Sequence, residues 1–83
     1  MAYSIQYKRS VEKDLARLDK REARRVLDKI EKELSTRPER YPALQGEFEG
    51  LRKMRLGDYR VIYALFGDTV LILRIGNRRD VYR

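Results

Sequence analysis

The chain has 83 residues and a formal net charge of +7, and it contains neither cysteine nor histidine. We therefore expect one domain spanning residues 1–83, and disulfides, thiolate chemistry and a zinc site built from His and Cys are excluded. No apolar run approaches the ~18 residues needed to span a bilayer, and no signal-peptide pattern opens the chain. We expect a cytoplasmic protein with no membrane contact, no metal and no cofactor.

The positive charge is distributed unevenly along the chain. Residues 1–50 carry a net charge of +2, and residues 51–83 carry a net charge of +5. A basic excess of this size favours a polyanionic partner, with nucleic acid ahead of a membrane surface. The alternative is an ordinary basic protein whose charge only aids solubility.

The N-terminal third predicts a strand followed by a helix. Residues 2–7 alternate, with Tyr3, Ile5 and Tyr7 on one face, which is typical of a strand. Ser10 is expected to cap a first helix. The apolar stripe of that helix has i, i+4, i+7 spacing and consists of Val11, Leu15 and Leu18.

A second helix is expected to begin at Lys20. Asp19 and Glu22 have the spacing of a capping box, which marks a helix N-terminus. A core-facing stripe follows, formed by Ala23, Val26, Leu27, Ile30 and Leu34. The opposite face carries mixed charges, which we interpret as a solvated, self-paired surface. Pro38 is expected to end the helix, with Thr36 and Arg37 in the last turn.

The C-terminal half predicts a loop and then three strands. Residues 37–49 form the loop, which Tyr41, Leu44 and Phe48 are expected to pin to the core. The strands cover residues 51–56, 59–66 and 69–77. Two-residue turns at Gly57-Asp58 and Gly67-Asp68 would join them into an antiparallel meander. With the first strand at one edge, the fold class is α+β: an N-terminal strand and a two-helix hairpin packed on a small, mainly antiparallel twisted sheet.

Strand alternation places several cations on one face of this sheet. Lys53 and Arg55 share a face, whereas Arg52 belongs to the other face. Arg60 lies across the hairpin, on the next predicted strand. Near the end of the chain stand Arg78 and Tyr82, a cation and a phenol that could converge on the same groove. The alternative is that each arginine stands alone on a solvated strand beside an aspartate. Three carboxylates cannot neutralise eight cations, however, and clustered guanidinium groups suit phosphate.

Two motifs in this region resemble the RelE/ParE superfamily of toxin–antitoxin toxins. They are Arg-x-Gly-Asp-Tyr-Arg-Val-Ile-Tyr at residues 55–63 and Ile-Gly-x-Arg-Arg-Asp-Val-Tyr at residues 75–82. The resemblance covers nearly the whole chain, including the opening strand, the helical hairpin and Leu44-Gln45-Gly46. The RelE-like branch is the more similar one, and its members are ribosome-dependent mRNA interferases.

This resemblance implies a metal-independent endoribonuclease that acts on mRNA in the ribosomal A site. The mRNA 2′-OH would attack the adjacent phosphate. The matching positions imply that the catalytic residues are Lys53, Arg55, Arg60, Arg78 and Tyr82. RNA contacts are expected from Arg52, Arg74, Arg79 and Arg83. The resemblance also implies a cognate antitoxin as partner.

The residue types suit that chemistry. Arginines keep their charge and can stabilise a pentavalent transition state. Repulsion from neighbouring arginines would favour the neutral amine of Lys53, and the same cluster would favour the phenolate of Tyr82, so either group could act as general base. Asn77 departs from the family pattern, where many relatives carry His or Lys.

Two other functions stay open at this point. A ParE-like toxin would share the fold but inhibit DNA gyrase by binding, without cleaving RNA. A plain nucleic-acid-binding module would have no catalytic role. The set of cations with a phenol favours the nuclease.

Overall fold

A computed structural model of the chain describes residues 3–44 and 50–77. Its centre is a four-stranded sheet in the order β1-β4-β3-β2. β1 (Ser4–Tyr7) runs parallel to β4 (Thr69–Asn77) at one edge, and β2 (Leu51–Leu56) and β3 (Tyr59–Phe66) complete an antiparallel meander. The predicted α+β class and the edge position of the first strand are confirmed.

The two hairpins form where the sequence predicts them. The boundaries of β2, β3 and β4 match the expected strands at 51–56, 59–66 and 69–77. Gly57 and Gly67 have φ angles of 60° and 57°, in the left-handed region that glycine adopts without strain. These turns fix the register, so that Leu56 lies opposite Tyr59 and Phe66 opposite Thr69.

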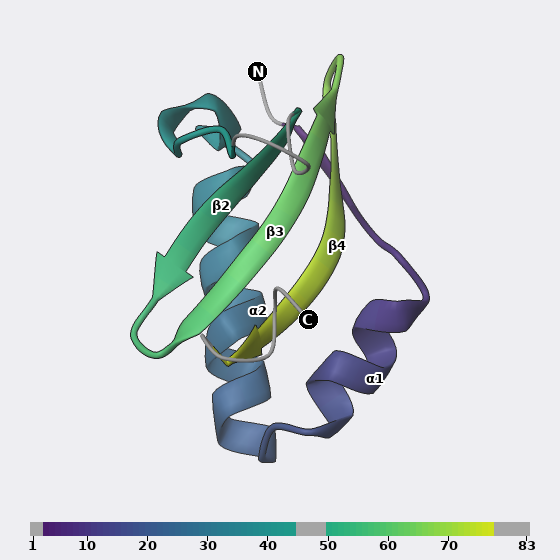
Figure 1. Cartoon of the computed structure of the whole chain (residues 1–83), viewed down its shortest axis with the longest axis vertical. Helices are drawn as coiled ribbons and strands as arrows, with labels where there is room; N and C mark the ends of the chain where they lie inside the picture. The colour runs from purple at the N-terminus through teal and green to yellow at the C-terminus, as the bar shows by residue number, and fades with distance from the viewer. Residues whose placement is uncertain (1–2, 45–49, 78–83) are drawn as a thin grey trace.

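Two helices follow β1, and Figure 1 shows α2 (Lys20–Leu34) crossing behind the sheet, with α1 (Ser10–Ala16) beside its β4 edge. The predicted start of α2 is confirmed, since the Asp19 carboxylate accepts a hydrogen bond of 2.7 Å from the Glu22 backbone N–H. In the part of the chain that the structure describes, neither helix is long and apolar enough to cross a membrane.

The remaining helix-boundary predictions need correction. Ser10 is the first helical residue rather than the cap, and its hydroxyl is buried without a hydrogen-bond partner. The last helical residue of α2 is Leu34, earlier than the expected turn at Thr36. A short 3₁₀ helix, η1 (Pro38–Arg40), follows within the predicted loop. Phe48 lies outside the described residues.

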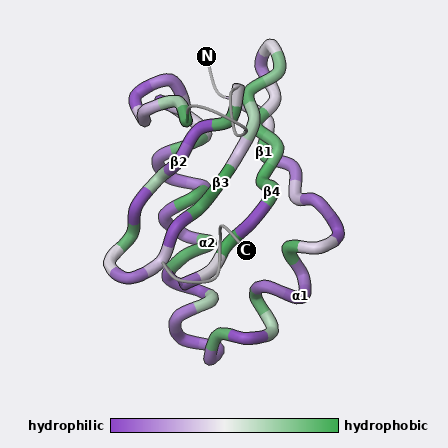
Figure 2. The backbone as a smooth tube through the Cα atoms, in the orientation of Figure 1, coloured by the Kyte–Doolittle hydropathy of each residue, from purple (hydrophilic) through white to green (hydrophobic). Residues whose placement is uncertain are grey.

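The core lies between α2 and the sheet. Its buried members come from both helices and three strands, and are Val11, Val26, Ile30, Leu34, Met54, Val61, Tyr63, Val70, Ile72 and Ile75. Figure 2 shows β3 and β4 as mainly hydrophobic, with hydrophilic stretches in the lower half of the sheet. The helices cover one sheet face, so the opposite face, here called the open face, is not covered by α1 or α2 (Figure 1).

A β-bulge in β4 changes which side chains face the core. Ile62 pairs with Arg74 while Tyr63 pairs with Ile72, so Leu73 is an extra residue in the ladder. A bulge shifts the alternation by one position. It therefore keeps both Ile72 and Ile75 buried on the core side and turns Arg74 away from it.

Candidate nucleic-acid interface

Three cationic side chains lie close together on the open face, near the β2–β3 turn. Arg55 is paired directly across the strands with Arg60, and Lys53 lies two residues before Arg55 on the same face. Directly opposed residues have Cβ atoms about 4.5–5.5 Å apart, and like charges placed in this way destabilise a sheet. The three, called here the cationic cluster, are brought together as the sequence predicts.

Within the described residues, neither Lys53 nor Arg55 forms an ion pair with a carboxylate. Arg55 is exposed, and Lys53 and Arg60 are partly exposed. In residues 3–44 and 50–77, the ion pairs are Arg25–Glu22, Lys29–Glu33 and Arg74–Asp14, and none of them reaches Lys53 or Arg55. On β4 the cross-strand neighbour of Arg60 is Gly76, which has no side chain. An anionic ligand could approach this end of the open face.

Arg52 does not belong to the cluster. It lies opposite Tyr63 on the core side of the sheet, and its guanidinium donates to the carbonyls of Tyr41 (2.7 Å) and Glu39 (3.2 Å). These bonds hold the segment around η1 against β2. The Tyr63 hydroxyl donates to the Pro38 carbonyl of the same segment. Burial raises the pKa of Tyr63 to about 12, with the Arg52 charge opposing the rise.

Arg74 is also engaged within the protein. Its Nε lies 3.2 Å from Oδ2 of Asp14 on α1, and the Ile75 backbone N–H donates to the same oxygen at 2.9 Å. The Asp14 carboxylate is almost fully buried, whereas the Arg74 side chain is 35% exposed. Arg74 therefore joins β4 to α1 and keeps part of its surface open to solvent.

The last predicted site residues, Arg78, Arg79, Tyr82 and Arg83, lie outside the described residues. β4 ends at Asn77, directly before Arg78 in the chain. The catalytic roles assigned to Arg78 and Tyr82 stay predictions.

Comparison with known proteins identifies the family. The family model of the ParE toxin of type II toxin–antitoxin systems, parDE, matches residues 5–82. Toxin RelG of Mycobacterium tuberculosis is 33% identical over 86 residues, an alignment that covers 100% of this chain and 99% of RelG. The chain belongs to the RelE/ParE superfamily of type II toxins.

Solved structures of RelE/ParE toxins agree with this assignment. The toxin–antitoxin complex RelBE2 of M. tuberculosis contains a chain that is 30% identical, with a TM-score of 0.89 and coverage of 96% of this chain and 95% of that one. The RelE–RelB complex of Pyrococcus horikoshii contains one that is 33% identical, with a TM-score of 0.68 and coverage of 98% and 100%. Because ParE and RelE names both occur among the matches, the activity must be argued from the site.

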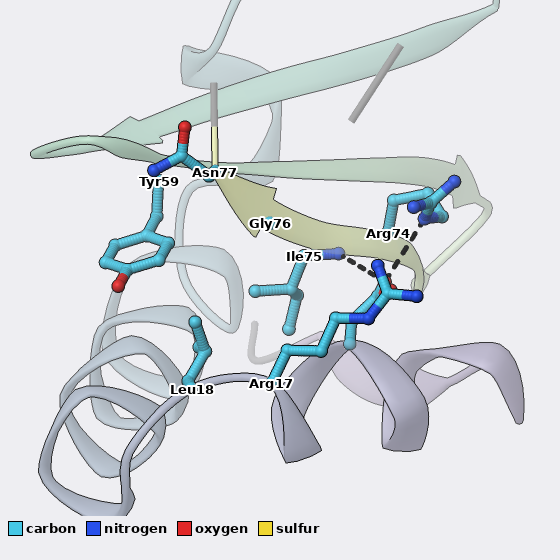
Figure 3. A pocket seen from close by; sticks show the side chains of 8 residues that line it. Arg17, Leu18, Tyr59, Arg74, Ile75, Gly76 and Asn77 are labelled. Atoms are coloured by element: carbon cyan, nitrogen blue, oxygen red, sulfur yellow. Dashed lines mark hydrogen bonds and ion pairs between the residues drawn. The ribbon is translucent and has the colours of Figure 1, made fainter. Parts of the chain in front are cut away.

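This RelE/ParE toxin has a second group of polar residues that the sequence reasoning missed. Asp14, Arg17 and Asn77 line one cavity between α1 and the end of β4 (Figure 3). A signal was present, because Asp14 interrupts the apolar stripe that runs from Val11 to Leu15 and Leu18. A carboxylate at a core-facing helix position indicates a buried partner. In the described parts of the chain, no group of three carboxylates could hold a metal ion.

Proposed function

We propose that this toxin is a ribosome-dependent, metal-independent endoribonuclease that cleaves mRNA and thereby inhibits translation. The observation that carries the proposal is the direct pairing of Arg55 with Arg60, beside Lys53, on a sheet face that α1 and α2 leave uncovered. Packing like charges in register costs stability, and a phosphate bound beside them would offset part of that cost. A phosphodiester matches guanidinium groups in charge and geometry.

The reaction is an internal displacement at phosphorus. The 2′-oxygen forms a bond to the adjacent phosphorus while the bond from phosphorus to the 5′-oxygen breaks, which leaves a cyclic phosphate and a 5′-OH. Arg55, Arg60 and Arg78 would stabilise the charge that gathers on the phosphate oxygens. Lys53 or Tyr82 would take the 2′-OH proton, and the other of the two can return a proton to the leaving oxygen. Proton transfer of this kind contributes typically 10²–10⁴-fold, so positioning of the message by the ribosome has to supply much of the rest.

The other predicted RNA contacts differ in how well they suit this role. Arg74 keeps exposed surface next to the open face and can contact the backbone of the message. Arg79 and Arg83 would extend the cationic surface along the chain. We do not include Arg52, because its guanidinium lies on the core side and binds backbone carbonyls.

The test is the position of RNA ends after expression in cells. Primer extension on translated messages should find new 5′ ends inside codons, and Arg60→Ala should reduce them by about 10²-fold, the loss typical of one transition-state donor. Arg24→Ala, on the outer face of α2, is the matched control and should cleave as the parent does. Undiminished cleavage by Arg60→Ala would remove the catalytic assignment.

The match to ParE toxins supports a second candidate, inhibition of DNA gyrase by binding alone. Under this function the cationic cluster would contact gyrase or its DNA without chemistry. A supercoiling assay with purified toxin and gyrase decides between them. Inhibition of supercoiling, without new RNA ends in cells, would favour the gyrase inhibitor over the nuclease.

A cognate antitoxin is the proposed protein partner, since similar chains occur in toxin–antitoxin complexes. A net charge of +7 favours an antitoxin segment rich in carboxylates. Covering the cationic cluster would inhibit the toxin by excluding RNA.

A further inference from the structure

A cavity of about 200 Å³ lies on the opposite side of the sheet from the cationic cluster, between the end of α1, the start of β3 and the end of β4. Figure 3 shows the Ile75 side chain extending from β4 between Tyr59 on one side and Arg17 on the other, with Leu18 below. The volume corresponds to roughly seven water molecules, at about 30 Å³ each. It is large enough for one planar ring system and too small for a base pair.

The walls of the cavity combine apolar and polar groups in the manner of a small-ligand site. Leu18, Ile75 and the Tyr59 ring supply apolar surface. The Arg17 guanidinium supplies hydrogen-bond donors, and Asn77 also lines the cavity. Aromatic rings and guanidinium planes are the two side-chain types on which unpaired RNA bases stack.

The charges that line the cavity nearly cancel among the described residues. Asp14 and Arg74 neutralise each other across their 3.2 Å contact, so they contribute no net charge to the cavity. Among the described residues that line the cavity, this leaves Arg17 as the net cation. Within the part of the chain that is described, no ion pair or side-chain hydrogen bond engages the Arg17 guanidinium, so it is available to a ligand.

The cavity and the cationic cluster meet at the end of β4. Gly76 lines the cavity and is the cross-strand neighbour of Arg60, which belongs to the cluster. Only the thickness of one sheet separates the two sites at this point. The two sites are therefore close enough for neighbouring groups of one RNA strand to reach both.

We propose that this cavity binds one unpaired nucleobase of the RNA strand, adjacent to the phosphate held by the cationic cluster, with the base between Tyr59 and Arg17. The site would hold the strand so that the bond to be cut stays at the cluster. The inference depends on the proposed RNA substrate, but base binding can be measured without any cleavage.

The experiment is an NMR titration of the full chain with the four nucleoside 5′-monophosphates, and separately with ribose 5-phosphate, which lacks the base. We expect saturable shifts of the Arg17 Nε–H, the Asn77 side-chain amide and the Gly76 backbone amide with at least one nucleotide. Ribose 5-phosphate should leave these three signals in place. Equal shifts with ribose 5-phosphate would show an anion site and overturn the proposal, as would nucleotide shifts confined to Arg55 and Arg60.

Variants separate base stacking from charge. Arg17→Gln should weaken nucleotide binding by about 5-fold or more, the size of one stacking contact. Arg17→Lys keeps the positive charge but removes the planar guanidinium group. It should therefore weaken nucleotide binding nearly as much as Arg17→Gln does. The matched control is Arg9→Gln, which removes the same charge from an exposed position at the other end of α1. Equal weakening by Arg9→Gln, or full binding by Arg17→Lys, would contradict the proposal. Because none of these readouts requires turnover, a toxin that cleaves no RNA could still bind a base here.

Discussion

Asp14 and Arg74 are 60 residues apart in the chain, yet the Asp14 carboxylate joins both the Arg74 side chain and the neighbouring Ile75 backbone N–H. β1 pairs with β4 only as far as Ile72, and within residues 3–44 and 50–77 no other strand accepts the backbone donors of the remaining edge. Unpaired edges are weak points of a sheet. A carboxylate from α1 takes the place of the missing strand and holds the end of β4 beside the candidate site.

The first prediction concerns this carboxylate. Asp14→Ala should lower the free energy of unfolding by about 2–3 kcal/mol, because it leaves the Ile75 N–H without an acceptor and removes the counterion of Arg74. The cost is below that of a fully buried pair, since Arg74 is 35% exposed and can be rehydrated. Asp14→Asn retains an acceptor and should cost about half as much.

Urea denaturation followed by circular dichroism measures these differences. Glu12→Ala is the matched control, because it removes an exposed carboxylate from the same helix and should change stability by no more than about 0.5 kcal/mol. If Asp14→Ala unfolds at the same urea concentration as Glu12→Ala, the carboxylate does not secure the end of β4.

The second prediction separates stability from activity at the cationic cluster. Arg55→Thr removes a like-charge pair with Arg60 and introduces a residue that favours strands. The variant should be more stable than the parent by about 0.2–1 kcal/mol and should cleave RNA poorly. Arg24→Thr, on the outer face of α2, should lose a little stability from lower helix propensity and keep its activity. A destabilised Arg55→Thr would mean that the cluster is neutralised within the protein.

Much of the fold follows from local patterns in the sequence. The glycines at 57 and 67 mark the turns, and once the turns are set the alternation of β2 and β3 places Met54 and Val61 inside and Arg55 and Arg60 outside. The Asp19 cap and the 3.6-residue stripe likewise define α2. These features depend on residues that are neighbours in the chain, so they can be predicted from the sequence.

Features that depend on contacts between distant parts of the chain were not predicted from the sequence. The bulge at Leu73 breaks the alternation of β4, and Arg74 pairs with Asp14 on α1, so it is not a simple RNA contact. The sequence predicts Arg52 as an RNA contact, but its guanidinium donates to the carbonyls of Glu39 and Tyr41 in the segment around η1. The cavity near Asn77 needs α1 and β4 to be placed side by side, which no local pattern specifies.

The third prediction concerns alkaline pH. Burial raises the pKa of the Tyr63 phenol from 10.0 to about 12, so the folded state binds this proton more tightly than the unfolded chain does. The protonated Tyr63 phenol therefore makes its full contribution to the free energy of unfolding below pH 10, and this contribution is lost as the pH rises through about 12. The loss amounts to at most about 3 kcal/mol. Burial beside Glu31 also raises the pKa of Tyr7 to about 12, which adds to the loss in the same window.

Denaturation curves between pH 8 and 12 check this expectation. Tyr63→Phe loses the hydrogen bond to the Pro38 carbonyl and should be less stable at neutral pH by about 1 kcal/mol. The stability of this variant should then decline less steeply above pH 10, because one phenol with a raised pKa is gone. Parallel declines in the parent and in Tyr63→Phe would show that the Tyr63 proton does not contribute.

The fourth prediction concerns the antitoxin. If a carboxylate-rich segment covers the cationic cluster, acetylation of Lys53 by a small reagent should be slower in the toxin–antitoxin complex than in the free toxin by about 5-fold or more. Lys32, exposed on the outer face of α2, provides the internal reference and should react at nearly the same rate in both. Mass spectrometry of the peptides gives both rates from one sample. Lys53 that reacts as fast in an inhibited complex as in free toxin would exclude masking of the cluster, and inhibition would then have to act through another part of the chain.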